Sequence, residues 1–250
     1  MQKKIAVIND LSGYGRCSLT VAIPVLSAMG HQCCPIPTAI LSNHTEFPVY
    51  FFDDYTEKMT TYTDKWKELG LSFDAIATGF LGSEAQIGIV MEIVQKLKAE
   101  KTFVVVDPVM GDHGHAYETY TPEMCEQMKE LVCMADIVLP NVTECCILTD
   151  TPYKKENWTR RELLNMAMML RLMGAKSVVI TGVREGSYYT NVVLERGQME
   201  AKFIRTRSSG GERPGTGDVF SSVVAGALLN GKSLPEAVAQ AAGFVKECIK

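Results

Sequence analysis

A glycine-rich segment near the end of the chain has the residue types and spacing to bind a phosphate group. The segment Gly215-Thr216-Gly217-Asp218 comes immediately before apolar residues that recur at helical spacing. The first backbone N–H groups of a helix lack internal partners and, with the helix dipole, present roughly half a positive charge. Glycines allow a ligand to approach this backbone closely. The segment therefore predicts an anion site at the start of a helix.

The carboxylate of Asp218 is unusual in an anion site, and two interpretations of it stand. An acidic residue in the first turn stabilises the helix dipole by about 0.3–1 kcal/mol, and on spacing alone this structural role is the simpler one. The chemical alternative is a general base that takes a proton from an alcohol while N–H groups hold the transferring phosphoryl group. Arg213, just before the segment, is either a phosphate contact or part of a solvated loop.

Further polar residues follow short apolar runs, where the strands of a parallel sheet would end. Ligands of such sheets bind beyond the carboxyl ends of the strands, so these residues are expected at one edge. They are Asn9 and Asp10, Gly79 and Phe80, Asp107, Asn141, and Thr181 and Gly182. Asp107 and Asp112 stand in one loop, where two carboxylates repel unless a cation or solvent screens them. For Asn141 the sequence favours equally a helix N-cap and a place in a ligand shell.

Several common site motifs are missing from the sequence. There is no phosphate-binding P-loop, and the Gly-Tyr-Gly at 13–15 lacks the third glycine of the dinucleotide fingerprint, because Ser18 stands there. There is no nucleophile elbow. His113 and His115 have no further Cys or His at zinc-ligand spacing. The eight cysteines form no Cys-x-x-Cys pair, so reduced, mostly buried thiols are expected.

The elements that must position these residues follow from the apolar periodicity, which alternates between short continuous runs and helical spacing. Strands are predicted at 4–9, 32–40, 73–78, 102–106, 136–139 and 177–180, with a hairpin at 188–194 and 199–205. Helices are predicted at 17–29, 54–69, 84–99, 122–133 and 160–173, with a helical region after 217. The strands lack polar alternation, as expected when both faces are covered. The pattern predicts an α/β fold, a three-layer α/β/α sandwich with a central, mostly parallel sheet.

Length and composition exclude several classes of protein. The chain has 250 residues, 46% of them hydrophobic and 22% charged, and a formal net charge of −4, which is typical of a globular protein and predicts one domain over 1–250. The acidic balance argues against nucleic-acid and anionic-membrane partners. No apolar run suits a membrane span or a leader, so a cytoplasmic location is expected. An apolar helical pattern runs to the last residue, and the sequence leaves open whether Lys250 is the native C-terminus.

Four segments occur in an informative order along the chain. They are Ser42-Asn43-His44-Thr45, Asp107-Pro108-Val109-Met110-Gly111-Asp112, Pro140-Asn141-Val142-Thr143-Glu144 and Gly215-Thr216-Gly217-Asp218. With them the chain resembles the ribokinase superfamily and, within it, the pyridoxal/pyridoxamine (vitamin B6) kinases. The resemblance runs from residue 5 to about 229, and the first two segments are its most specific parts. It implies a ribokinase-like fold and ATP-dependent phosphorylation of the 5′-hydroxymethyl group of a B6 vitamer.

The resemblance also implies a role for individual residues. Asp218 is the expected catalytic base, and the backbone of Gly215, Thr216 and Gly217 the expected anion hole. ATP and Mg²⁺ are expected at Asp107, Asp112, Asn141, Glu144, Thr181, Gly182 and Arg213, with Asp107 and Glu144 on the metal side and the 207–214 loop over the nucleotide. The vitamer is expected at Asp10, Ser12, Leu41, His44, Thr45 and Phe80. A homodimer is implied, and a monovalent-cation requirement stays open.

Two residues depart from the family pattern. Well-studied pyridoxal kinases have serine where this chain has Asp10, and often tyrosine where it has Phe80. A carboxylate at position 10 can accept from a ring hydroxyl or pair with a cationic amine, so pyridoxal, pyridoxamine and pyridoxine all stay candidates. The alternatives are a hydroxymethylpyrimidine or sugar kinase of the same superfamily, and a nucleotide-binding protein without transfer activity. Leu41 and Phe80 suit a flat heteroaromatic ring better than a sugar, and Asp218 argues for transfer.

Overall fold

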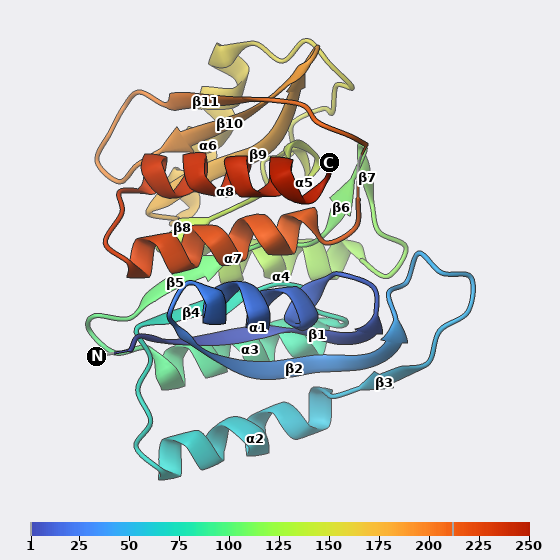
Figure 1. Cartoon of the computed structure of the whole chain (residues 1–250), viewed down its shortest axis with the longest axis vertical. Helices are drawn as coiled ribbons and strands as arrows, with labels where there is room; N and C mark the ends of the chain where they lie inside the picture. Colours follow the sequence, from blue (N-terminus) through green and yellow to red (C-terminus); the bar gives the residue numbers. More distant parts are fainter. Residues whose placement is uncertain (1, 212) are drawn as a thin grey trace.

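The central feature of the fold is one nine-stranded sheet with the order β11-β10-β9-β8-β5-β4-β1-β2-β3 (Figure 1). The structure is a computed structural model that describes residues 2–211 and 213–250. The strands are β1 (Lys4–Tyr14), β2 (Gln32–Asn43), β3 (Phe52–Asp54), β4 (Ala75–Thr78), β5 (Phe103–Val106), β8 (Ile137–Val138), β9 (Ser177–Glu185), β10 (Tyr188–Leu194) and β11 (Lys202–Arg207). A separate small sheet pairs β6 (Gly111–Asp112) with β7 (His115–Ala116).

The strand directions confirm the predicted fold class. Neighbouring strands run parallel from β9 through β8, β5, β4 and β1 to β2. The antiparallel pairs lie at the two sides of the sheet, where β10 joins β9 and β11, and where β3 joins β2. Short strands joined through helices favour parallel pairing, whereas the hairpin after β9 allows only antiparallel pairing.

Helices cover both faces of the sheet. They are α1 (Ser18–Ala28), α2 (Thr56–Glu68), α3 (Glu84–Leu97), α4 (Pro122–Cys133), α5 (Val142–Leu148), α6 (Arg160–Met173), α7 (Thr216–Leu229) and α8 (Leu234–Cys248). In Figure 1, α1, α7 and α8 lie in front of the sheet, and α3 and α4 lie behind it. The predicted three-layer sandwich is therefore present.

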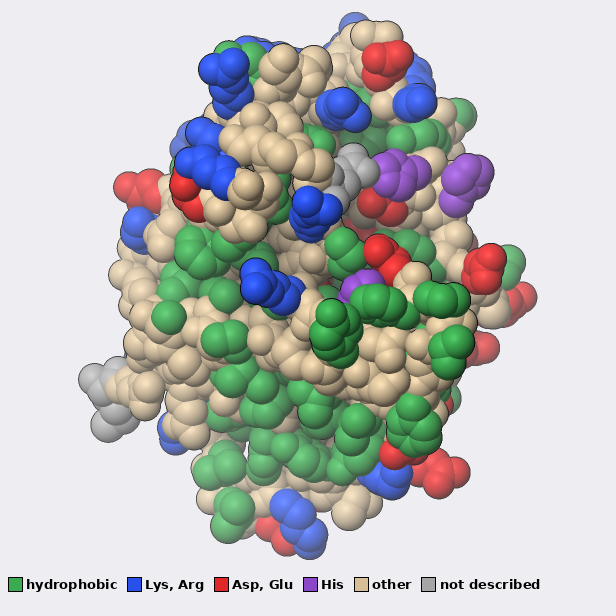
Figure 2. Space-filling model, turned by 45° about the vertical axis from the view of Figure 1, so that its right-hand side comes forward, with side chains coloured by type: hydrophobic (Ala, Val, Ile, Leu, Met, Phe, Trp, Pro, Cys, Tyr) green, Lys and Arg blue, Asp and Glu red, His purple; other side chains and the backbone are tan. Residues whose placement is uncertain are grey.

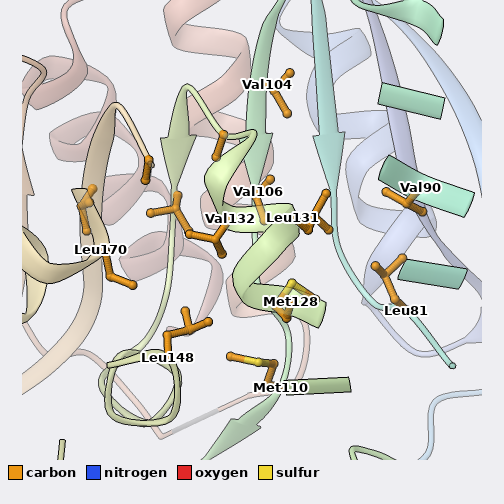
Figure 3. Close-up of a cluster of buried hydrophobic side chains, with 14 of the residues drawn as sticks. Leu81, Val90, Val104, Val106, Met110, Met128, Leu131, Val132, Leu148 and Leu170 are labelled. Carbon is orange, nitrogen blue, oxygen red and sulfur yellow. The ribbon is translucent and has the colours of Figure 1, made fainter. Parts of the chain in front are cut away.

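Side chains of one strand alternate between two hydrophobic cores. In β1, Ile5 and Val7 pack with α1, α7 and α8, whereas Ala6 and Ile8 pack on the opposite face with α2 to α6. Figure 3 shows part of this second core, where Val106 of β5 and Leu131 of α4 lie side by side. Burial on both faces explains why the central strands show continuous apolar runs.

Several predicted boundaries are wrong in an informative way. β1 was expected to end at residue 9 but continues to Tyr14, because its register with β2 shifts between Asn9 and Leu11 and pairing then resumes. β9 continues past the predicted end to Glu185 through Gly182, which has a φ of +67°. β3, α5, β6 and β7 were not predicted, since elements of two to seven residues are too short to show a period.

Two broader expectations have different outcomes. All eight cysteines are free thiols, but they are not mostly buried: Cys17, Cys145 and Cys146 are buried, and Cys133 and Cys248 are exposed. Within the described residues, none of the helices combines the length and apolarity needed to cross a bilayer. The single domain over 1–250 stays a prediction.

Candidate active site

The carboxylate of Asp218 lies in the first turn of α7 and is fixed by two donors from distant parts of the chain. Oδ1 accepts from Asn9 Nδ2 at 3.0 Å, and Oδ2 accepts from the backbone N–H of Ser18 at 2.8 Å. Ser18 donates from an uncommon left-handed conformation, with a φ of +51°. β1 and the start of α1 thus hold a half-buried carboxylate in one orientation.

The surroundings of Asp218 raise its pKa toward neutral pH. Burial raises its pKa to about 6, the bonds from Ser18 and Asn9 oppose the rise, and the negative charge of Asp10 adds to it. A carboxylate with a pKa of about 6 is ionised at pH 7 and takes up a proton more readily than an ordinary aspartate. These properties suit a general base.

Asn9 is a residue of the candidate site to which the sequence analysis assigned no individual role. It is buried, and its Oδ1 accepts from the backbone N–H groups of Asp10 at 3.0 Å and Phe80 at 2.9 Å while its Nδ2 donates to Asp218. A Cβ on Gly79 would lie 2.4 Å from this amide, so the glycine makes room for it. Asn9 therefore ties the carboxylate of α7 to the turn after β4.

The two glycines before Asp218 have different environments. Gly215 has a φ of +79°, and a Cβ there would lie 1.8 Å from the carbonyl oxygen of Arg16. A Cβ on Gly217 would meet nothing within 4 Å. Between them, Thr216 Oγ1 donates to the carbonyl of Arg213 at 3.1 Å, and the Arg213 residue itself is exposed. Gly215 is thus required for chain packing, whereas Gly217 leaves the helix start open to a ligand.

A row of carboxylates continues from Asp218 across the sheet edge. Burial and the charge of Asp218 raise the pKa of Asp107 to about 8, against a hydrogen bond from Ser221. Burial and the charge of Asp107 raise the pKa of Glu144 well above its usual range, and the exposed Asp112 adds to this. Burial is the larger cause of both shifts and repulsion between neighbouring carboxylates adds to it, so positive charge nearby would lower both pKa values.

Asn141 and Glu144 are held by the start of α5. Their side chains form a reciprocal capping box, with Glu144 N bonded to Asn141 Oδ1 at 2.9 Å and Asn141 N to Glu144 Oε2 at 2.7 Å. Glu144 Oε1 also accepts from Met110 N at 3.2 Å, and Asn141 Nδ2 donates to the carbonyl of Gly111 at 2.8 Å. The cap expected for Asn141 is therefore present, and both Glu144 oxygens already accept backbone bonds.

Strand β9 and the segment after β8, which follow β5 in the order of the sheet, carry the remaining residues expected near a nucleotide. Thr181 forms an isolated parallel bridge with Asn141, and its N–H donates to Pro140 O at 2.8 Å. The N–H of Gly182 donates to Asn191 Oδ1 at 3.1 Å. Of the 207–214 loop that was expected to cover the nucleotide, residue 212 lies outside the described residues.

On the other side of Asp218, the strands β1 and β2 bring polar and apolar groups together. Asp10 is buried and accepts from Ser12 Oγ at 2.8 Å; burial raises its pKa, against the hydrogen bonds from Ser18 and Ser12. Ser12 and the buried Leu41 are direct partners in the β1–β2 register. The half-buried Phe80 lies at the end of β4, bound to Asn9 through its N–H.

The His44 and Thr45 side chains differ in exposure. The imidazole of His44 covers Gly15, where a Cβ would lie 2.4 Å from the ring, and it packs on Phe47 at 4.6 Å between centroids. Thr45 is exposed. Figure 2 shows histidine and acidic side chains around a hollow on this face, beside a broad gathering of hydrophobic side chains.

Comparisons with known proteins show the family and the fold of this chain. The family model described as "Phosphomethylpyrimidine kinase" matches residues 22–250. A putative phosphomethylpyrimidine kinase from Bacteroides thetaiotaomicron is 42% identical over 98% of this chain and 84% of its own, with a TM-score of 0.94, and its orthorhombic crystal form was solved with pyridoxal. Pyridoxal kinase from Lactobacillus plantarum is 29% identical over 98% of this chain and 87% of its own, with a TM-score of 0.90.

A curated relative covers the whole chain. Pyridoxine kinase from Bacillus subtilis is 28% identical over 100% of this chain and 84% of its own length. The fold and these relatives define a kinase of the ribokinase-like class, as the sequence predicted. Within that class, the chain belongs to the phosphomethylpyrimidine kinase family.

Proposed function

We propose that this protein is an ATP-dependent kinase that phosphorylates the 5′-hydroxymethyl group of a vitamin B6 vitamer. The observation that carries the proposal is the Asp218 carboxylate, oriented by Asn9 and Ser18 at the start of α7, with a pKa of about 6. Support for the vitamer comes from the 42% identical relative, whose second crystal form holds pyridoxal.

The proposed transfer uses the two sides of the α7 N-terminus. Asp218 takes the proton of the hydroxymethyl group, and the oxygen forms a bond to the γ-phosphorus of ATP. The bond between that phosphorus and the β–γ bridging oxygen breaks, and ADP leaves. The free N–H groups at the start of α7 offset charge on the transferring group, since phosphoryl transfer depends mainly on position and charge neutralisation.

The carboxylates beside Asp218 fit a magnesium–nucleotide complex. Within the described residues, no cluster of three or more His, Cys, Asp or Glu side chains suits a metal ion, and both Glu144 oxygens accept backbone bonds. Mg²⁺ retains waters and is commonly bound through one or two carboxylates and substrate phosphates. Asp107 and Glu144, which repel each other, are the residues proposed to face that hydrated ion. When bound, Mg²⁺ supplies positive charge to the phosphates.

We assign the remaining site residues to the two substrates. Asp112, Asn141, Thr181, Gly182 and Arg213 are proposed for the nucleotide side, around the strand ends next to Asp107. The vitamer side is proposed to consist of Asp10, Ser12, Leu41, His44, Thr45 and Phe80. A buried carboxylate at Asp10 favours a substrate that donates a hydrogen bond or carries a cationic amine.

A screen of acceptors tests the proposal. ADP release is measured with pyridoxal, pyridoxine, pyridoxamine, hydroxymethylpyrimidine and ribose under identical Mg²⁺ and ATP. The expected result is the highest kcat/KM with one of the three B6 vitamers. ADP release with none of the acceptors, despite measurable ATP binding, would identify a nucleotide-binding protein and contradict the proposal.

The second candidate is a hydroxymethylpyrimidine kinase, which the matching family model favours by its description. Its substrate is also a flat heteroaromatic ring with a hydroxymethyl group, and would suit Phe80 and Leu41 equally. A higher kcat/KM for hydroxymethylpyrimidine than for every vitamer would select this candidate.

A further inference from the structure

A small cavity lies beside Asp218, between strands β1 and β4 of the sheet and helices α1 and α7. Its volume is about 20 Å³, and it is lined by residues of β1, β4, α1 and α7. Six of its eleven lining residues are aliphatic, and the polar ones are Asn9, Thr78, Asp218, Ser221 and Ser222. The cavity therefore adjoins the hydrogen-bonded Asn9–Asp218 pair.

The hydroxyl of Thr78 is the unexplained group in this cavity. Thr78 is the last residue of β4 and is 5% exposed. Its Oγ1 is fully buried and has no hydrogen-bond partner within the described part of the chain. A buried hydroxyl without a partner lowers stability, and native proteins nearly always satisfy such a group with protein or with ordered water.

The volume of the cavity suits a single water molecule. One water molecule needs about 10–15 Å³ of such space and two to four polar partners. The cavity offers about 20 Å³, Thr78 and four further polar residues. It is too small for a phosphate or an organic ligand, and its mostly aliphatic wall is a poor coordination shell for a cation.

We propose that one ordered water molecule occupies this cavity, anchored by Thr78 Oγ1 and hydrogen-bonded to the Asn9–Asp218 side. Thr78 is then a positioning residue: it does not touch substrate, and it acts on the base through the water. A donor beside the carboxylate favours its ionised form, which a base needs. The hydration site stands on the cavity and the buried hydroxyl, whereas its effect on turnover rests on the proposed function of Asp218.

The first experiment locates the water directly. In a high-resolution crystal structure of the full chain, a density peak is expected in the cavity at hydrogen-bond distance, roughly 2.6–3.2 Å, from Thr78 Oγ1. The Thr78→Val variant, which has the same shape without the hydroxyl, should lose this peak. An empty cavity in the wild-type crystal, or an anomalous peak there after soaking with thallium, overturns the proposal.

The second experiment measures the effect on the base. The acid limb of the kcat profile should move up by about half a unit to one unit in Thr78→Val, the size expected for losing one neutral hydrogen bond. Thr78→Ser keeps the hydroxyl and should restore the wild-type limb. Thr63→Val makes the same change at a fully buried threonine of α2 that bonds Met59 O, and should leave the profile unchanged.

The outcomes separate this inference from the proposed function. An unmoved acid limb in Thr78→Val, with normal folding by circular dichroism, overturns the positioning role. If instead Asp218→Ala retains full turnover, the role of Asp218 as base is wrong, while the density peak still decides the hydration site.

Discussion

The surroundings of two aspartates at the site raise their pKa values to different extents. The pKa of Asp218 is raised to about 6 and that of Asp107 to about 8, in both cases chiefly by burial. In the chain without a bound metal ion, Asp218 therefore gives up its proton at a lower pH than Asp107. Pairs of acids with separated pKa values are typical of sites in which one of them acts as base. Among these carboxylates, Asp218 is the group with both the donors and the proton affinity for that role.

Replacing Asp218 with alanine tests this role. The Asp218→Ala variant should lower kcat by roughly 10²- to 10⁴-fold, the usual contribution of a general base, while ATP affinity by calorimetry changes little. In the wild type, kcat should fall as the pH drops below about 6, because protonation removes the base. Asp64→Ala, at a surface aspartate paired with Lys96, is the control. Wild-type turnover in Asp218→Ala would exclude Asp218 as the base.

The raised pKa of Asp107 predicts how the stability of the protein depends on pH. Since its folded-state pKa of about 8 lies above the usual value of 3.8, the folded state binds more protons than the unfolded state between these values. The contribution of Asp107 to stability is therefore present at low pH and lost as the pH rises through about 8. Asp107→Asn should raise the Tm of the nucleotide-free protein at pH 8 by at least about 2–4 °C, the equivalent of about 1 kcal/mol.

Melting temperatures measured at pH 5 and pH 8 check the predicted direction of this pH dependence. The gain in Asp107→Asn should shrink toward pH 5, where the wild-type carboxyl is already protonated. Depressed pKa values at Asp54, Asp74 and Asp136 act in the opposite direction in both proteins and cancel in the difference. A destabilised Asp107→Asn at pH 8 would contradict the prediction.

The connections between elements, more than the elements themselves, build the site. β1 bends between Asn9 and Leu11, and α1 begins at Ser18, so both present donors to a carboxylate on α7. Local patterns in the sequence predicted most of the strands and the longer helices, and the family resemblance implied the role of Asp218 as base. The sequence did not predict the bond from Asn9 to Asp218, because the two residues are 209 positions apart and no periodicity encodes that contact.

The difference between local and long-range contacts also explains which other site features the sequence did not predict. For Asn141 the sequence favoured a helix cap and a ligand-shell role equally, and the capping box that the structure shows is a local feature. Thr78, by contrast, belonged to an apolar run in which nothing marked a buried hydroxyl beside a cavity. Contacts within about four residues leave a pattern in the sequence, whereas the packing of β4 against α7 does not.

The loop between β11 and α7 provides a matched pair of glycine variants. In Gly215→Ala, the new Cβ meets the carbonyl of Arg16 at 1.8 Å in a conformation that favours glycine, so the start of α7 must move. Gly217→Ala adds its methyl to open space. We expect kcat to fall at least about tenfold more in Gly215→Ala than in Gly217→Ala, since small displacements of reacting groups are costly.

A third variant separates packing from charge at this loop. Gly217→Asp introduces a carboxylate among the N–H groups proposed to bind phosphate, and should abolish turnover while thermal stability stays close to that of Gly217→Ala. Equal turnover in the two Gly217 variants would contradict the anion hole.

Exposed apolar side chains are concentrated in one region of the molecular surface. Large apolar side chains are exposed on and around β2 and β3, and we call this set the apolar edge surface: Tyr14, Ile40, Phe47, Val49, Tyr50, Phe51 and Phe52. Figure 2 shows hydrophobic side chains gathered on this face of the molecule. Within the described residues β3 is also the last strand on its side of the sheet, and such edges are usually covered or charged.

The homodimer implied by the family resemblance would cover this surface with a second copy of the chain. The prediction is a dimer in solution at micromolar concentration, and a monomer after Val49→Glu with Phe51→Glu, whose parent residues are 81% and 65% exposed. Buried like charges would face each other across a two-fold interface, and this repulsion opposes association. Leu172→Glu, at an 87% exposed residue of α6 outside the apolar edge surface, should leave the dimer intact. Light scattering coupled to gel filtration measures all three, and a monomeric wild type, or a double variant that still dimerises, would show that this surface does not join two copies.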